Sequence, residues 1–275
     1  MKKELFLQLV AIFVITQALG LFVADRLIQE QVSVTIVNDN PQDVSNSAGL
    51  FVYIIFGTGL LLLLIKFLKD KILFFALKAL ESIVIFGTST LVFSVFYDSI
   101  LMVFFAIILV ATRLVFYKNV LLRNVTSVIS TAGAGALIGV SLGIIPVIVF
   151  LIALSIYDYI AVFKTKHMVT LAKSITAKNL SFTYALPTKE HQFELGTGDL
   201  VMPLAFAASV LTTTKLAYAF PYYFIPPIII LVASLIGLFL TMGYLSNRVG
   251  KALPALPPQA VLMIIAFILL KLVGV

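Results

Sequence analysis

The stretch LGTGDLVMPL, residues 195–204, decides the fold, because it places an aspartate between a pair of glycines and a long apolar run. The run continues to about residue 219, and a bilayer-spanning helix needs roughly 20 mostly apolar residues. An acid at membrane depth costs on the order of 2.5–3.5 kcal/mol on insertion scales. Asp199 is therefore a candidate functional residue at the beginning of a membrane helix.

The composition of the whole chain agrees with a membrane location. Of its 275 residues, 61% are hydrophobic and only 11% charged, which lies outside the range of soluble globular proteins. The 19 basic residues outnumber the 12 acidic ones, but they fall in short gaps between apolar runs, so a nucleic-acid partner is not expected. The absence of cysteine excludes disulfides, thiolate metal sites and cysteine nucleophiles.

Apolar runs of spanning length predict an all-α, polytopic membrane protein with nine transmembrane helices. The first run follows Met-Lys-Lys and is longer than the apolar part of a signal peptide, so we interpret it as a retained helix. A break between the fifth and sixth runs is indicated by Gly143 and Pro146. The predicted helices lie near residues 5–24, 48–67, 72–96, 99–117, 122–142, 145–163, 196–219, 223–246 and 257–274.

The distribution of charge predicts the orientation. If the N-terminus is cytoplasmic, every basic residue except Arg26, Lys215 and Lys271 falls on the cytoplasmic side. Cytoplasmic loops of membrane proteins carry an excess of Lys and Arg. We therefore expect the N-terminus inside and the C-terminus outside.

A single membrane domain is expected, in three parts. Residues 1–163 carry the first six helices, residues 164–195 form a cytoplasmic loop, and residues 196–275 carry the last three helices. The loop is polar and is expected to be mobile, with a short extended or amphipathic piece at FTYALP, residues 182–187.

Three glycines in and after the fifth run predict close helix packing. Gly135, Gly139 and Gly143 recur every four residues, which makes a groove on one helix face. Small residues at this spacing let a second helix approach closely.

Three acids fall within the predicted helices, namely Glu81, Asp158 and Asp199. Asp158 precedes the cytoplasmic boundary at Lys164 by six residues, or about 9 Å at a rise of ~1.5 Å per residue. Asp199 lies at a similar depth on the next helix, which runs the opposite way. Glu81 has Lys78 one turn away, and a local ion pair is its expected role.

Two carboxyl groups at one depth on consecutive helices suit general acid–base catalysis. Close carboxyls do not both ionise cheaply, so one keeps a proton while the other is charged. Gly196 and Gly198 leave room beside Asp199 for water and an extended substrate. The prolines of KALPALPP, residues 251–258, keep the beginning of the last helix irregular, and irregular backbone at membrane depth must border protein or a wet cavity.

Three motifs stand in order on the sixth, seventh and ninth helices: SIYDYIAVF at 155–163, LGTGD at 195–199 and PALP at 254–257. Together they resemble the presenilin and signal peptide peptidase family of intramembrane aspartyl proteases, whose motifs are YD, GxGD and PAL. The resemblance implies that Asp158 and Asp199 are the catalytic pair of an endopeptidase that cleaves transmembrane segments. It also implies that Pro254, Ala255 and Leu256 shape the site. Tyr157 either places a hydroxyl near the pair or packs as an aromatic ring.

The resemblance also implies the partners. The substrates would be transmembrane-helix proteins or signal peptides, with no cofactor or metal, in the cell membrane. DLVMP is closer to the signal peptide peptidase branch, whereas the cytoplasmic N-terminus is closer to presenilin. A compact microbial or archaeal homologue that needs no accessory subunits fits best, and a homo-oligomer is left open.

Other protein classes remain as alternatives. A cation or proton transporter, or a leak channel, would use the same intramembrane acids, but it gives no reason for PALP. A prepilin-peptidase-like enzyme also uses GxGD. A zinc protease is disfavoured because the chain has only two histidines, His167 and His191, and a rhomboid-like mechanism because no serine–histidine pair stands within the predicted helices.

Overall fold

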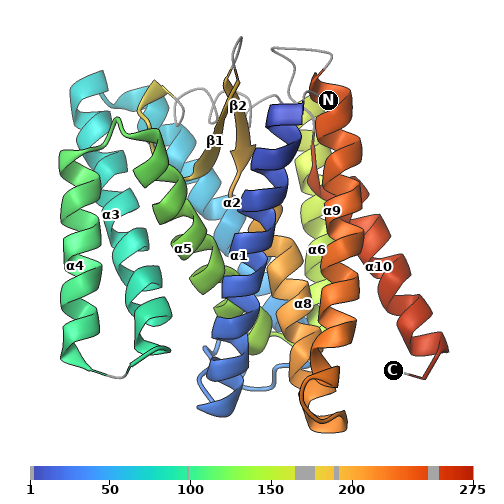
Figure 1. Cartoon of the computed structure of the whole chain (residues 1–275). Coiled ribbons are helices and arrows are strands. Elements are labelled where there is room, and N and C mark those ends of the chain that lie inside the picture. Colours follow the sequence, from blue (N-terminus) through green and yellow to red (C-terminus); the bar gives the residue numbers. More distant parts are fainter. Residues whose placement is uncertain (1–2, 98, 165–176, 189–191, 247–253, 275) are drawn as a thin grey trace.

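The structure, a computed structural model, describes residues 3–97, 99–164, 177–188, 192–246 and 254–274. These residues form a helical bundle with a two-stranded sheet at one end (Figure 1). The helices are α1 (Lys3–Gln29), α2 (Val44–Phe67), α3 (Asp70–Ser94), α4 (Ile100–Val115), α5 (Val120–Ser141), α6 (Ile144–Tyr159), α8 (Gly198–Ala217), α9 (Ile225–Ser246) and α10 (Leu256–Leu272). Short π- and 3₁₀-helical segments are η1 (Ile160–Lys164) and η2 (Tyr222–Phe224), and the strands are β1 (Thr183–Pro187) and β2 (Gln192–Gly196).

Each predicted apolar run contains a helix in the described part of the chain. Seven of these helices are long and apolar enough to cross a membrane. The other two, α4 and α10, are apolar but have 16 and 17 residues, somewhat short of the usual spanning length. The protein is therefore an integral multi-pass membrane protein, whereas the count of nine spans and the orientation stay predictions.

The outer surface of the bundle is apolar, as expected where helices meet lipid. On α2, Phe56 is 70% exposed, and on α4 Ile100 is 74% exposed. α2 buries only Asn46 and Ser47 among its residues. In water such surfaces would be an aggregation hazard, so their extent is consistent with a protein made for a bilayer.

The predicted break between the fifth and sixth helices is confirmed. α5 ends at Ser141, and the chain is extended at Leu142 before α6 begins after Gly143. The Gly143 N–H donates to the carbonyl of Pro41 at 2.7 Å, and a Cβ on Gly143 would collide with the Gln42 side chain. Pro146 lies in the first turn of α6, where a missing N–H costs little.

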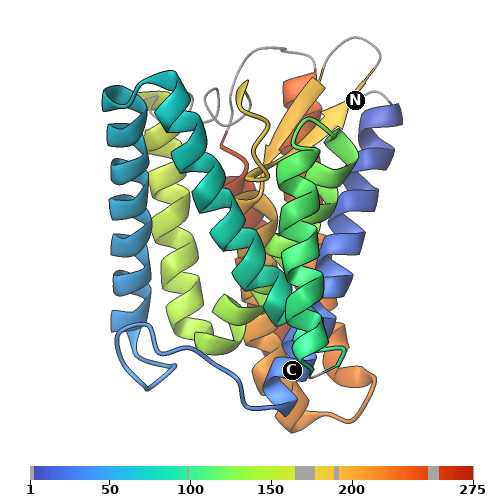
Figure 2. The same ribbon diagram turned by 90° about the vertical axis from the view of Figure 1, so that its left-hand side faces the viewer.

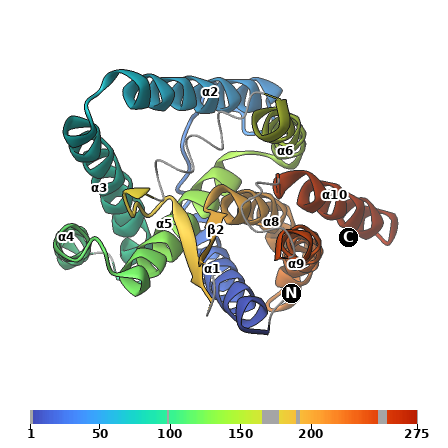
Figure 3. The same cartoon turned by 90° about the horizontal axis from the view of Figure 1, so that it is seen from above.

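α8 is the central helix of the bundle. It packs against α1, α5, α6, α9 and α10, and the view from above shows it surrounded by them (Figure 3). Most of its residues from Leu200 to Leu211 are buried. Because Asp199 lies at the beginning of α8, its position is determined by the packing of α8 against these five helices.

The predicted glycine groove is confirmed at two of its three positions. A Cβ on Gly135 would lie 2.7 Å from a methyl group of Leu204 on α8. A Cβ on Gly139 would meet the main-chain oxygen of Ala205, also on α8. Close approach of α5 and α8 therefore requires these glycines, whereas Gly143 belongs to the beginning of α6 instead.

The strand pair lies at the same end of the bundle as the N-terminal end of α1 (Figure 2). β1 and β2 are antiparallel, with Thr183 opposite Gly196 and Pro187 opposite Gln192. β1 is the extended piece predicted at 182–187, but its partner β2 was not predicted.

The strand pair differs from the polar mobile loop expected over 164–195, because residues of this segment are buried in the bundle. Tyr184 and Leu186 are fully buried, in the same apolar cluster as Leu9 of α1. Residues 165–176 and 189–191, with both histidines, lie outside the described residues.

Candidate active site

Packing of α6, α8 and α10 brings the two predicted catalytic acids together. Asp158 lies in the last turn of α6, and Asp199 is the second residue of α8. Leu154, Met202 and Leu256, one from each of these helices, belong to one buried apolar cluster. The carboxyl groups of Asp158 and Asp199 are near enough to interact electrostatically, and both residues are half-buried.

Asp199 is held by the turn that precedes it. Its carboxyl group interacts with the backbone N–H of Gly196. A Cβ on Gly196 would lie 3.3 Å from Oδ2 of Asp199, tighter than an ordinary van der Waals contact, whereas a Cβ on Gly198 would meet no atom within 4 Å. The two glycines of GxGD therefore differ: Gly196 fits closely around the carboxyl, and Gly198 borders open space.

The proline-rich segment reaches the other acid. The carboxyl group of Asp158 interacts with the backbone N–H of Leu256, the first residue of α10. Pro254, Ala255 and Leu256 are all buried. The chain thus places the PAL segment next to the acid of the sixth helix.

Two local features of α6 accompany Asp158. The helix widens into the π-helical segment η1 at Ile160, and single π turns are frequent at functional sites. The ring of Tyr157 packs edge-on against Phe51 of α2, with centroids 6.1 Å apart. Aromatic packing, one of the two predicted roles of Tyr157, is therefore present.

Two further residues fix the beginning of α8, and sequence reasoning missed both. Gln17 on α1 is buried, and its Nε2 donates to the carbonyl of Leu200 at 3.1 Å. Thr197, between the two glycines, donates from its N–H and its hydroxyl to the carbonyl of Phe182, at 3.2 and 3.1 Å. The sequence signal that could have identified Gln17 is an amide side chain inside an apolar run, because a buried amide needs a hydrogen-bond partner.

α5 covers the edge of β1 that does not pair with β2. The Asn124 side chain bonds both to the N–H of Ala185 and to its carbonyl, at 2.9 and 2.8 Å. Opposite residues of antiparallel strands alternate between hydrogen-bonded and non-hydrogen-bonded pairs. The main-chain N–H and carbonyl of Ala185 face Asn124, so Ala185 and its opposite residue Glu194 form a non-hydrogen-bonded pair. The main-chain N–H and carbonyl of Glu194 therefore face away from β1. Since the sheet has two strands in the described part of the chain, the outer edge of β2 carries no third strand.

Glu81 forms the predicted local pair and more. Its carboxylate lies 2.6 Å from Lys78 Nζ and 3.2 Å from Arg113 of α4, and it accepts the N–H of Ser181 at 2.6 Å. Glu81 therefore ties α3 to the chain that leads into β1. Among the described residues, no three His, Asp or Glu side chains gather as metal ligands would.

Comparison with known proteins shows which class of protein has this fold. Two solved structures of a presenilin family intramembrane aspartate protease, in C222 and P2 space groups, have the same fold, with TM-scores of 0.67 and 0.68. Sequence identity is 20% and 22%, and the match covers 96% and 98% of both chains. A comparison with curated proteins finds no match. The fold is thus that of a presenilin-type membrane protease.

The family model of signal-peptide peptidase, presenilin aspartyl protease matches residues 10–194, more than half of the chain. The chain belongs to this family and is a presenilin-type intramembrane aspartyl protease.

Proposed function

We propose that the protein hydrolyses peptide bonds within transmembrane segments of other membrane proteins, using Asp158 and Asp199 as a catalytic dyad. The observation that supports the proposal is that the two carboxyls lie near enough to interact electrostatically, each beside a backbone N–H. An acid at membrane depth is costly and marks function by default. A pair of neighbouring acids is the arrangement that aspartic proteases use.

The chemistry follows from a shared proton. The ionised carboxyl takes a proton from water as the water oxygen attacks the peptide carbonyl carbon, while the protonated carboxyl donates to the carbonyl oxygen. The C–N bond of the resulting gem-diol then breaks: one carboxyl of the dyad donates a proton to the nitrogen, which leaves as an amine, while the other carboxyl takes a proton from one hydroxyl, which becomes the carbonyl of the new carboxyl group. The two proton affinities belong to the coupled pair, so neither role is assigned to one residue.

A substrate helix must unwind, because helical hydrogen bonds shield its carbonyls. The outer edge of β2 suits the unwound segment, since an extended peptide adds to a free sheet edge through main-chain hydrogen bonds. This edge runs from Gln192 to Gly196, whose N–H contacts Asp199. A strand along it would reach the dyad at Gly196, and the open space at Gly198 would receive the scissile peptide. The PAL segment would close the site from the side of Asp158.

The wider setting is part of the same proposal. Substrates are transmembrane-helix proteins or signal peptides, the location is the cell membrane, and the protein works without accessory subunits. Residues 1–163 supply Asp158, and residues 196–275 supply Asp199 and the PAL segment, within one membrane domain.

Cleavage of a labelled transmembrane peptide by the purified protein in liposomes tests the proposal. Fragments identified by mass are expected from the wild type and not from Asp158→Ala or Asp199→Ala. Asp70→Asn is a matched control, because Asp70 is a fully exposed acid at the beginning of α3. Cleavage that persists in either dyad variant would reject the dyad. Ion flux that needs both acids, without fragments, would instead favour a transporter.

A further inference from the structure

Arg123 of α5 joins both strands of the sheet to the helix. It is 1% exposed, although it carries a charge. Its Nε donates to the carbonyl of Thr183 on β1 at 3.1 Å, and its Nη2 contacts the Thr183 hydroxyl. The same guanidinium donates to both carboxylate oxygens of Glu194 on β2, with Nη1 at 3.3 Å from Oε1. One side chain therefore fixes α5, β1 and β2 relative to each other.

The geometry of these contacts requires arginine. A guanidinium presents several N–H donors in a rigid plane, whereas a lysine ammonium acts as a point charge on a flexible stem. Glu194 is 20% exposed on its side chain and Arg123 only 1%, so the pair is largely shielded from water. Removing one partner of a buried pair leaves the other charge uncompensated, which is strongly unfavourable.

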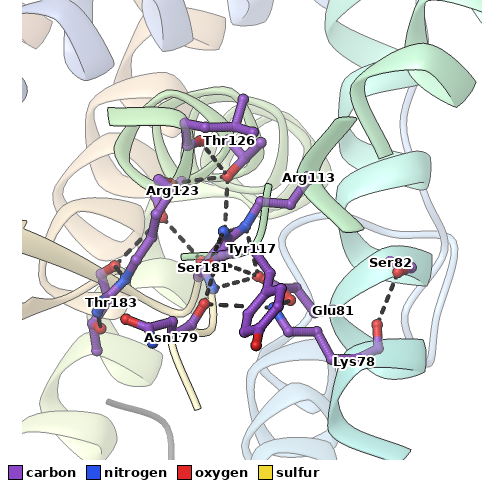
Figure 4. Close-up of polar contacts among 12 residues, drawn as sticks. Lys78, Glu81, Ser82, Arg113, Tyr117, Arg123, Thr126, Asn179, Ser181 and Thr183 are labelled. Atoms are coloured by element: carbon purple, nitrogen blue, oxygen red, sulfur yellow. Dashed lines mark hydrogen bonds and ion pairs between the residues drawn. The ribbon is translucent and has the colours of Figure 1, made fainter. Parts of the chain in front are cut away.

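A second cluster holds the chain just before β1 (Figure 4). Arg113 of α4 donates to the carbonyl of Asn179 and, at 2.9 Å, to the hydroxyl of Ser181. Glu81 accepts the Ser181 N–H, and Ser127 of α5 donates to the Ser181 carbonyl at 3.0 Å. The segment from residue 179 to β1 is thus fixed to three helices. Arg123, together with the pairing of β1 and β2 and the hydrogen bond from the Thr183 hydroxyl to Glu194 at 2.8 Å, extends this anchoring to β2.

β2 leads directly to the dyad. Glu194 is followed by Leu195 and by Gly196, which lies so close to Asp199 that a Cβ on it would be 3.3 Å from Oδ2 of that residue. Main-chain groups of Glu194 and Gly196 face the outer edge of β2, as the register with β1 requires. A shift of β2 along β1 would therefore move the substrate edge and the Asp199 carboxyl relative to each other.

We propose that Arg123 is a positioning residue for the proteolytic reaction, which sets the register of β2 and hence which peptide bond of a substrate strand lies at the dyad. This inference rests on the proposed function. Arg123 touches neither the substrate nor the reacting atoms, and it acts through Glu194 and Thr183. A change of Arg123 would therefore alter which peptide bond is cleaved, whereas a change of a purely stabilising residue would not.

The test compares cleavage positions and rates of four purified proteins in liposomes, with the same transmembrane peptide and mass identification of fragments. Arg123→Lys keeps the charge and loses the planar donors, and Glu194→Gln keeps the size and one acceptor oxygen. Asp25→Asn is the matched control, because Asp25 of α1 forms a shielded ion pair with Lys215 near the other end of α1. Thermal midpoints are recorded for all four proteins.

For Arg123→Lys and Glu194→Gln we expect kcat to fall about 10-fold or more, with KM changed less, since small misplacements at a site cost this much. We also expect the fragments to spread over neighbouring bonds. Asp25→Asn is expected to lower the thermal midpoint and to cleave the same bonds as the wild type. Unchanged cleavage positions in both variants would overturn the inference, whether their rates are normal or fall only in step with their thermal midpoints.

The two proposals fail in different ways. If the wild type gives no fragments, the proposed function fails, and the inference falls with it. If the wild type cleaves and Asp199→Ala does not, while the Arg123 and Glu194 variants cut the same bonds, only the inference fails. If Arg123→Lys does not fold, Glu194→Gln decides, because Glu194 is partly exposed and the substitution is isosteric.

Discussion

The carboxyl group of Asp158 interacts with the backbone N–H of Leu256, and this contact joins the last turn of α6 to the first residue of α10. Residues almost a hundred positions apart in the chain thus meet at the candidate site. The Leu256 side chain, 6% exposed, packs in the same apolar cluster as Leu154 and Met202 of the two helices that carry the acids. Both the backbone and the side chain of Leu256 therefore contribute to the geometry of the dyad.

Leu256→Ala keeps the N–H but removes the side chain that packs α10 against α6 and α8. We expect kcat for peptide cleavage to fall about 10-fold to 100-fold, because the carboxyls lose their fixed separation. Leu269→Ala is the matched control on α10, since Leu269 is 56% exposed. Steady-state kinetics in liposomes checks the prediction, and equal effects of the two substitutions would contradict it.

The two glycines of GxGD are expected to differ when each is replaced by alanine. Gly196→Ala places a methyl group 3.3 Å from Oδ2 of Asp199, so kcat should fall on the order of 10-fold. Gly198→Ala meets no protein atom within 4 Å, so it should leave the thermal midpoint unchanged and raise KM by crowding the substrate. Kinetics and thermal unfolding measured together separate the two cases. A lower thermal midpoint for Gly198→Ala would be inconsistent with the structure.

Gly139→Ala should destabilise the bundle, because the added methyl group would collide with the main-chain oxygen of Ala205 on α8. Overpacking of this kind costs roughly 1–3 kcal/mol. Gly57→Ala on α2 is the control, since a Cβ there meets nothing within 4 Å. Thermal unfolding in detergent is the measurement. If the control is destabilised as much as Gly139→Ala, close packing of α5 on α8 is not the cause.

The buried hydroxyl of Tyr184 is expected to make the folded protein less stable at high pH. Burial on β1 raises the pKa of its hydroxyl to about 12, although a hydrogen bond to Thr131 opposes the shift. In the unfolded chain the pKa is about 10, so between pH ~10 and ~12 the folded state binds more protons and stability falls as pH rises. Tyr184→Phe should have a flatter profile than the wild type over this range, by up to ~2–3 kcal/mol. Parallel profiles in thermal unfolding from pH 9 to 12 would disprove a protonated, buried Tyr184.

N-methylated substrates test the strand edge of β2. Only alternate residues of an added strand point their N–H groups at the edge. Methylation of one peptide nitrogen at a time along the scissile segment should therefore slow cleavage in an alternating pattern, by about 10-fold at the sensitive positions, since each methyl removes a donor worth about 1 kcal/mol and adds bulk. Mass analysis of the fragments gives the rate at each position. A uniform response would speak against pairing with β2.

Much of the fold was predictable because its causes are local. Apolar runs of spanning length mark the helices, and the cost of an acid in lipid singles out Asp158 and Asp199. Spacing of Gly135 and Gly139 indicated a close helix contact, and Lys78 stood one turn from Glu81. In each case the physical reason operates between residues near in sequence or between a residue and the membrane.

The partners of the polar residues were decided by the tertiary structure alone. Arg123 and Glu194 are separated by 71 positions, and Gln17 and Leu200 by 183, so no local pattern links them. The polar stretch before α8 reads as a loop, because, apart from the pairing of β1 with β2, the hydrogen bonds and ion pairs that hold it come from side chains of α3, α4 and α5. By itself the sequence determined which segments enter the membrane and which acids are costly there. Only the packing of helices decided that these acids lie near each other, and which buried charges hold the two strands, because those contacts join residues far apart in the chain.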